Sequence, residues 1–183
     1  MKKLLGILVL ILFTLQTPSW ADDIRDFQIE GMSIGDSLLD YFSEKDIKSS
    51  VFKTTYKSKK YTKVEFYDRT KLYDGLQFYF KKNDKKYIIH VLSAHLKYEY
   101  NIEDCYKKQD EIVEELSSLF VNQEKIEYGI ESLEPDEKGT WKPTNFEFSS
   151  GAAVSVTCFK LDIYNDHLKL TLYSKEYKDY VSR

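Results

Sequence analysis

The clearest pattern of hydrophobic and polar positions lies in residues 101–120. Uncharged side chains recur there at steps of three and four residues, and most positions between them are charged. The recurring residues are Ile102, Cys105, Tyr106, Gln109, Ile112, Val113, Leu116, Leu119 and Phe120. This spacing predicts an amphipathic α-helix, with Asn101 as its N-cap and Asp104 in its first turn. A one-sided helix must cover an apolar surface, and we expect that surface to be an antiparallel sheet.

Strand-like segments flank this helix on both sides. They are residues 63–67, 75–81 and 87–96 before it, and 126–133, 141–148, 153–164 and 168–172 after it. The segment 141–148 is ambiguous: it alternates like an edge strand, but Pro143 limits how early it can pair. Within 153–164 the apolar parity changes between Cys158 and Phe159, which predicts a β-bulge there.

The first part of the chain predicts a second, shorter helix. Ser33 is placed to cap it, Asp36 follows three residues later, and the helix is expected to end near Glu44. Residues 46–60 have no clear period and predict a connector, and residues 175–181 suit a short terminal helix. Together these patterns predict one α+β domain, residues 22–183, with a mostly antiparallel sheet covered by one long and one short helix.

The first 21 residues have the pattern of a secretory signal peptide. Lys2 and Lys3 precede an apolar run over residues 4–13, and small residues at Ser19 and Ala21 mark a cleavage site. A membrane span is the competing interpretation, but the run is shorter than the roughly 20 residues that a span needs. We therefore expect a mature chain that starts at Asp22, without a transmembrane segment, in the periplasm or outside the cell.

The charge of the mature chain is modest but unevenly distributed. It would carry 25 basic and 30 acidic side chains, a balance that argues against nucleic acid as a bulk partner. Residues 45–86 hold 13 basic and 5 acidic side chains, whereas residues 99–137 hold 3 basic and 13 acidic ones. These are either two solvated faces or binding patches. We expect any anionic partner, such as a lipid headgroup or an acidic protein, to choose the basic region, with Lys57, Lys59 and Lys60 as candidates.

Two cysteines in an exported chain predict one disulfide. Cys105 lies on the apolar stripe of the helix, and Cys158 shares strand parity with Val154 and Val156. Both thiols would therefore point into the core from elements that pack together. The alternative is two independent buried cysteines.

Candidate chemistry is sparse in this sequence. His90, His95 and His167 stand in positions typical of structural or exposed histidines, and no nucleophile, zinc or phosphate-loop motif occurs. We therefore expect no catalytic residue, metal site or cofactor. The chain has 15 tyrosines, many of them beside the lysines. They either form a binding surface that includes Tyr61 or simply suit half-buried strands. Trp141 is either a plug over the sheet or an exposed contact.

Gly31-Met32-Ser33, a predicted short helix and then a sheet resemble the Gly-Met-Thr start of certain small exported domains. These are the outer-membrane assembly lipoproteins and the fold-related β-lactamase-inhibitor proteins. The resemblance covers about a dozen residues and implies a non-catalytic domain that binds other proteins through its sheet or loops. This chain departs in having serine for threonine, no lipidation cysteine and a long second helix. We expect a protein-binding domain of a bacterial periplasm. The alternative is a small periplasmic hydrolase or carbohydrate-active enzyme that uses strand carboxylates.

Overall fold

The computed structural model describes residues 23–52, 58–67, 69–134, 138–162 and 164–182. Within them, eight strands form one antiparallel sheet in the order β1-β2-β3-β8-β7-β6-β4, and β5 also pairs with β6. The strands are β1 (Tyr61–Phe66), β2 (Gly75–Lys81), β3 (Val91–Lys97), β4 (Glu124–Glu127), β5 (Glu131–Ser132), β6 (Gly139–Glu147), β7 (Ala153–Leu161) and β8 (His167–Tyr173). The helices are α1 (Glu44–Ser49), α2 (Ile102–Leu119) and α3 (Lys175–Val181), with 3₁₀ turns η1 (Ile24–Asp26) and η2 (Leu38–Asp40). The expected α+β class with an antiparallel sheet is thus confirmed.

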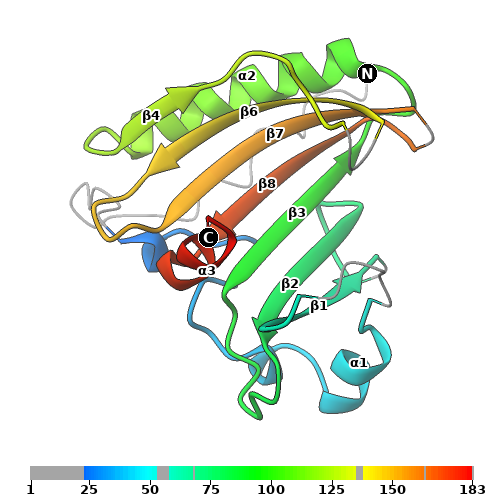
Figure 1. Ribbon diagram of the computed structural model, residues 1–183, viewed down its shortest axis with the longest axis vertical. Coiled ribbons are helices and arrows are strands. Elements are labelled where there is room, and N and C mark those ends of the chain that lie inside the picture. The colour runs from blue at the N-terminus through cyan, green and yellow to red at the C-terminus, as the bar shows by residue number, and fades with distance from the viewer. Residues whose placement is uncertain (1–22, 53–57, 68, 135–137, 163, 183) are drawn as a thin grey trace, which may run out of the picture.

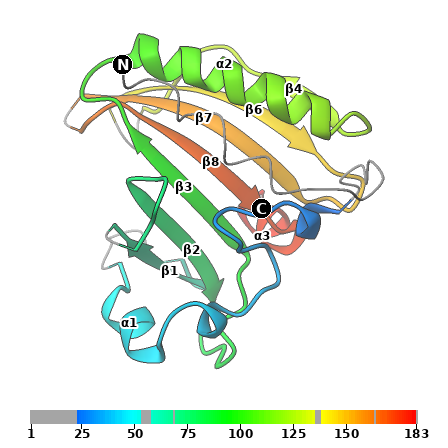
Figure 2. The same cartoon turned by 180° about the vertical axis from the view of Figure 1, so that it is seen from behind.

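Different elements cover the two faces of this sheet. Helix α2 packs against β7 and β8 on one face, which the amino-terminal segment also crosses (Figure 2). We call this the helix-covered face; it carries Val154, Val156 and Cys158 of β7. The opposite face, toward the viewer in Figure 1, has only the short helix α3 across one end. We call it the open face; on β7 it carries Ser155, Thr157 and Phe159 and their alternating neighbours.

Helix α2 follows the predicted pattern closely. The Asn101 side-chain oxygen accepts a hydrogen bond from the backbone N–H of Asp104 at 3.3 Å, so Asn101 is the N-cap as expected. Cys105, Gln109 and Leu116 are buried along the stripe. The buried polar member, Gln109, bonds to the sheet through its amide nitrogen, whereas its buried Oε1 has no hydrogen-bond partner among the described residues. Its amide nitrogen donates to the carbonyl oxygens of two strands, at 2.6 and 2.8 Å.

The predicted helix over residues 33–44 is wrong. Gly35 has φ +94°, a left-handed conformation that interrupts a right-handed helix. Its N–H donates to the carbonyl oxygen of Ile89, and the N–H of Leu38 donates to that of Tyr87, so this stretch pairs with an extended segment. The Ser33 hydroxyl donates to the carbonyl oxygen of Phe27 at 2.8 Å rather than capping a helix. Only the 3₁₀ turn η2 forms, and α1 begins at Glu44, where the predicted helix was expected to end.

Two predictions for neighbouring segments also differ from the structure. Residues 87–89 pair with the amino-terminal segment, and β3 starts at Val91 rather than at residue 87. The expected connector 46–60 contains most of α1 and an extended contact in which the Phe52 N–H donates to the Lys63 carbonyl oxygen. Residues 53–57 of that connector lie outside the described part of the chain. The terminal helix is present as α3, as predicted.

Strand β6 is an interior strand, because β7 pairs with one side of it and β4 and β5 with the other. Pro143 is tolerated because its carbonyl oxygen accepts from the Tyr128 N–H, just beyond the end of β4. With any other residue here, the backbone N–H would point to the same side as this carbonyl oxygen, toward the interruption between β4 and β5. The missing N–H of Pro143 therefore removes no hydrogen bond between β6 and β7. The predicted strand 126–133 is therefore divided into the short strands β4 and β5.

The predicted bulge near Cys158 is also wrong. The β7–β8 register runs without a break from Ala153 opposite Tyr173 to Phe159 opposite His167. Parity appeared to change because Phe159 and Leu161 are apolar residues of the open face. Strand β7 therefore has apolar side chains on both of its faces.

Candidate functional site

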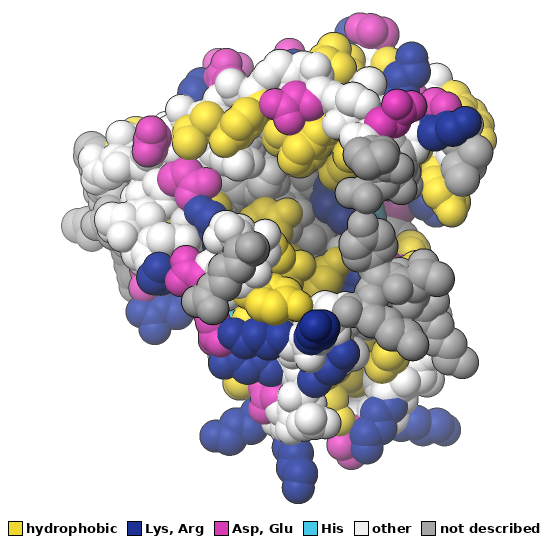
Figure 3. Space-filling view, viewed as in Figure 1, with side chains coloured by type: hydrophobic (Ala, Val, Ile, Leu, Met, Phe, Trp, Pro, Cys, Tyr) yellow, Lys and Arg dark blue, Asp and Glu magenta, His cyan; other side chains and the backbone are white. Residues whose placement is uncertain are grey.

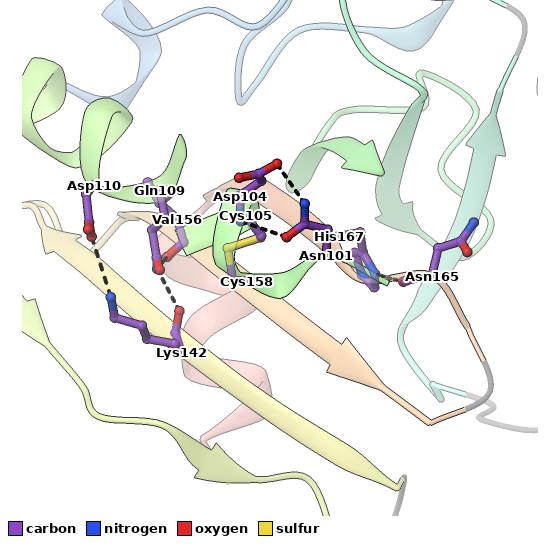
Figure 4. Close-up of a disulfide and its surroundings, with 10 residues drawn as sticks. All are labelled: Asn101, Asp104, Cys105, Gln109, Asp110, Lys142, Val156, Cys158, Asn165 and His167. Atoms are coloured by element: carbon purple, nitrogen blue, oxygen red, sulfur yellow. Dashed lines mark hydrogen bonds and ion pairs between the residues drawn. A yellow bond between two sulfur atoms is a disulfide. The ribbon is translucent and has the colours of Figure 1, made fainter. Parts of the chain in front are cut away.

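The predicted disulfide is present and lies on the helix-covered face (Figure 4). Cys105 of α2 is bonded to Cys158 of β7, and their Cα atoms are 6.0 Å apart. Next to it, the Gln109 amide reaches the carbonyl oxygens of Lys142 and Val156. One covalent bond and two hydrogen bonds therefore hold α2 against β6 and β7, and this face has a structural role.

The candidate binding residues predicted from sequence are not brought together. Tyr61 is in β1 and only 2% exposed, and Trp141 is in β6, with four strands between them. Lys60 forms an ion pair with Glu176 at 2.6 Å. Lys59 is exposed, and Lys57 lies outside the described residues. The residues of this prediction do not form one site.

Helix α3 closes one end of the open face. The Tyr177 ring contacts those of Tyr61, Tyr79 and Tyr173, with centroids 5.0, 5.3 and 6.1 Å apart. Burial raises the pKa of Tyr177 to about 12. Hydrogen-bonded ion pairs with Lys60, just before β1, and Lys81, at the end of β2, lower the pKa of the Glu176 carboxyl to about 2. The tyrosines here serve as packing residues between α3 and the sheet.

A row of stacked rings crosses the other end of the open face. Trp141 of β6 stacks on Phe159 of β7 at 6.3 Å between centroids, and Phe159 stacks on His167 of β8 at 5.0 Å. His167 in turn stacks on His95 of β3 at 5.9 Å with an interplanar angle of 5°. All four rings are partly exposed. We call Trp141, Phe159, His167 and His95 the ring row.

A row of hydrogen-bonded polar side chains lies between the ring row and α3. The Gln77 amide donates to Glu65 at 2.6 Å, and the Thr171 hydroxyl donates to Ser93 at 3.0 Å. Lys169 joins the two rows: its ammonium donates to Gln77 at 3.3 Å and lies 5.8 Å from the centre of the Phe159 ring. These buried polar groups satisfy one another, so this part of the sheet does not need a covering helix.

The environment of the ring row is positively charged. Burial lowers the pKa of His95 to about 2, and the charges of Lys169, Lys63 and Lys97 act in the same direction. His95 is therefore neutral at physiological pH, and its buried Nε2 has no hydrogen-bond partner in the structure described. The carboxylate of Glu65 accepts from Lys63 at 2.9 Å and from Gln77, so it is already engaged.

The surface above these rows is hollowed. Figure 3 shows a depression in the middle of the open face, with hydrophobic and basic side chains exposed inside it. The row of rings together with Lys169 is the feature that sequence analysis missed. Its signal was the parity change at Phe159, which was interpreted as a bulge, and the two histidines, each of which was interpreted as structural or exposed.

One other pocket in the described part of the chain is lined by acids. A pocket of about 430 Å³ near the start of α2 has two acids in its lining, Glu103 and Asp162. Both are exposed, so neither has the buried environment that makes a carboxyl group a general acid near neutral pH. Among the described residues, no group of three His, Cys, Asp or Glu side chains could hold a metal ion.

Comparisons with known proteins provide no family assignment for this chain. No family model, no curated protein and no solved structure matches the chain. None of the helices in the described ranges is long and apolar enough to cross a membrane.

Proposed function

We propose that the chain is an exported, non-catalytic domain that binds another protein through the open face of its sheet. The observation that carries this proposal is the ring row, a stack of four rings on four adjacent strands that α2 and α3 leave partly exposed. Aromatic side chains held rigid by stacking provide a large contact area at little entropic cost, and Trp leads the residue types found in interface hot spots.

The extent of the ring row favours a macromolecular partner over a small one. Neighbouring strands are separated by about 4.8 Å, so four rings on adjacent strands extend over roughly 14 Å. That length fits a segment of another protein chain better than a single small ring. Lys97 and Lys169 lie close enough to influence His95, which favours a partner segment carrying acidic side chains beside apolar ones, whereas Lys63 is already paired with Glu65.

The proposed location is the periplasm of a bacterium or the space outside the cell. Residues 1–21 have the signal-peptide pattern, and a disulfide such as Cys105–Cys158 persists in oxidising compartments. Both features fit export, and together they support a binding domain that works outside the cytoplasm.

The rival proposal, a hydrolase using strand carboxylates, finds less support in the geometry. Glu65 of β1 and Glu147 of β6 both belong to the open face, but four strands separate them. Five steps between strands amount to roughly 24 Å along the sheet, whereas paired glycosidase carboxylates stand about 5 to 10 Å apart. Glu147 is also paired with Lys178 of α3.

Photocrosslinking in living cells tests the proposed face. A benzoyl-phenylalanine placed at Phe159 should form adducts with a specific envelope protein. The same group at Leu119, which is 43% exposed on α2, is the matched control and should not form them. Identical adducts from both positions, or none from position 159 in cells that produce the protein naturally, would contradict the proposal.

A further inference from the structure

Exposed lysines gather at the end of the molecule that is farthest from α2. Figure 1 places α1 and the β2–β3 turn at this end, and Figure 3 shows basic side chains projecting from it. The lysine end, as we call it, consists of Lys45, Lys48, Lys59, Lys82, Lys85 and Lys86, all exposed. Hydrogen bonds join the elements that carry them: Ser37 donates to the Lys86 carbonyl oxygen at 2.6 Å, and Tyr87 donates to Glu44 at 2.9 Å.

Three nearby acids are engaged by other groups, whereas Asp40, between Leu39 and Tyr41, is exposed. Both oxygens of Asp84 accept backbone N–H groups of its own turn, each at 2.9 Å. Asp46 accepts from the Ser43 hydroxyl at 2.7 Å and pairs with Arg69 at 3.5 Å. Glu44 pairs with Lys48 at 2.9 Å. The ammonium groups of Lys45, Lys85 and Lys86 are left without an acidic partner among the described residues.

The lysines of α2 and β4 named below differ from Lys45, Lys85 and Lys86 in this respect. On α2, Lys107 pairs with Asp104 at 3.1 Å and Lys108 pairs with Glu111 at 2.8 Å. On β4, Lys125 pairs with its neighbour Glu127 at 2.7 Å. The charge of these lysines is locally balanced, as is that of Lys48 at the lysine end, whereas the charges of Lys45, Lys85 and Lys86 are not.

Apolar side chains lie beside the unbalanced lysines. Leu39 and Tyr41 are each 42% exposed, and they follow Leu38, whose N–H donates to the carbonyl oxygen of Tyr87. Basic residues next to exposed apolar ones are typical of surfaces that lie on anionic membranes, where the charges meet headgroups and the apolar groups enter the interface.

A pocket of about 470 Å³ opens at the same end and has room for a headgroup. Its lining includes Lys81, Lys82, Ile88 and His90. The Asp84 carboxylate also lines it, but this acid is occupied by the backbone of its turn. A phosphate group entering the pocket would meet Lys82, which pairs with no acid among the described residues, whereas Lys81 is already paired with Glu176 at 2.7 Å.

We infer that the lysine end binds an anionic lipid surface, with lysines on phosphate groups and Leu39 at the interface. Lysines on three separate elements, a headgroup-sized pocket and adjacent apolar side chains fit a broad lipid surface better than one acidic peptide. The ring row has no residue at this end, so the inference is independent of the proposed protein-binding function. A molecule bound this way would keep its open face accessible from the side.

Vesicle co-sedimentation tests this inference directly. The protein is purified after export, and its intact mass defines its amino terminus. It should sediment with vesicles of equal parts phosphatidylglycerol and phosphatidylcholine at low salt, and not with pure phosphatidylcholine. Near an anionic surface each lysine changes binding by about fivefold. The variant K45Q/K85Q/K86Q should therefore bind more than tenfold more weakly, and salt should weaken the wild type because it screens these charges.

The control variant K107Q/K108Q/K125Q removes the same charge from the lysines that are already paired. It should bind the anionic vesicles like the wild type, and circular dichroism should show both variants folded. Equal losses in the two variants, or equal binding to neutral vesicles, would overturn the inference. So would stronger binding to polyglutamate than to the vesicles, since that result would assign the lysine end to an acidic protein. Unchanged vesicle binding by a Leu39→Ser variant would show that Leu39 does not enter the membrane interface.

Discussion

The two faces of the same sheet are built on opposite principles. On the helix-covered face, the residues of β3, β7 and β8 are aliphatic and fully buried: Leu92, Val154 and Leu172. One position along each strand, the open face has Ser93, Ser155 and Thr171, which are also buried but polar. The first face is stabilised by apolar burial and a disulfide, and the second by mutual hydrogen bonds and stacked rings. The helix-covered face can therefore stabilise the fold while the open face keeps partly exposed aromatic and basic groups for binding.

Truncating one phenylalanine on each face should give the largest difference in stability between the two faces. Phe146 is 1% exposed on the helix-covered face, and Phe159 is partly exposed in the ring row of the adjacent strand. Phe146→Ala should lower the free energy of unfolding by about 3 to 5 kcal/mol, because it leaves a cavity. Phe159→Ala should lower it by less than about half as much. Urea unfolding of both variants measures the difference, and equal losses would show that the faces do not differ in role.

Removing the disulfide should destabilise the packing of α2 on the helix-covered face and leave binding by the open face unchanged. Cys105 and Cys158 are 53 residues apart, and the chain-entropy estimate for such a loop is about 4 kcal/mol, often less in practice. Reduction, or the double variant C105S/C158A, should lower the free energy of unfolding by about 2 to 4 kcal/mol. Crosslinking from position 159 should survive at temperatures where the variant is folded. Loss of the adducts in a folded variant would mean that the open face depends on the bond.

Mild acid should destabilise the protein through the open face. The pKa of His95 is lowered to about 2 in the folded state, mainly by burial, against an ordinary value near 6.5. The unfolded chain binds the proton first, so this contribution is complete above pH 6.5 and is lost as the pH falls below it. Between pH 7.5 and 5.5 the loss should be about 1 kcal/mol.

The control for this pH effect is His95→Gln, which cannot take up a proton. Its free energy of unfolding should change less over the same pH range than that of the wild type. The pKa values of His90 and His167 are also lowered by burial, so part of the slope should persist. A variant slope as steep as the wild-type slope would show that His95 is not the buried base described above.

The smallest effect should come from the ion pairs at the end of the open face. The pKa of Glu176 is lowered to about 2, so its stabilising contribution is complete above about pH 4.5 and is lost as the pH falls toward 2. The carboxylate is 42% exposed, and Glu176→Gln should cost less than about 1 kcal/mol at pH 7. Glu114→Gln on α2 is the matched control. A larger loss from the control would contradict a role for Glu176 in holding α3.

Sequence patterns predicted the elements with strong local signals. Helix α2 follows from periodicity and its cap from Asn101, and the Cys105–Cys158 bond follows from parity together with the presence of two cysteines in a chain with an export signal pattern. The helix over 33–44 was mispredicted because Gly35 and long-range pairing with residues 87–89 outweigh a local capping pattern. The ring row could not be assembled from sequence, because it depends on which strands are neighbours. Strands β3 and β8 are adjacent in the sheet although 69 residues lie between them.

Co-purification from the native envelope tests the central claim most directly. The wild type, the open-face variant W141S/F159S and the control variant L119S/V121S, which changes two exposed apolar residues near the end of α2, are compared by quantitative mass spectrometry. We predict that at least one envelope protein is retained by the wild type and the control and lost by the open-face variant, with all three proteins folded. Retention of the same proteins by the open-face variant would contradict the claim that the open face is the binding site.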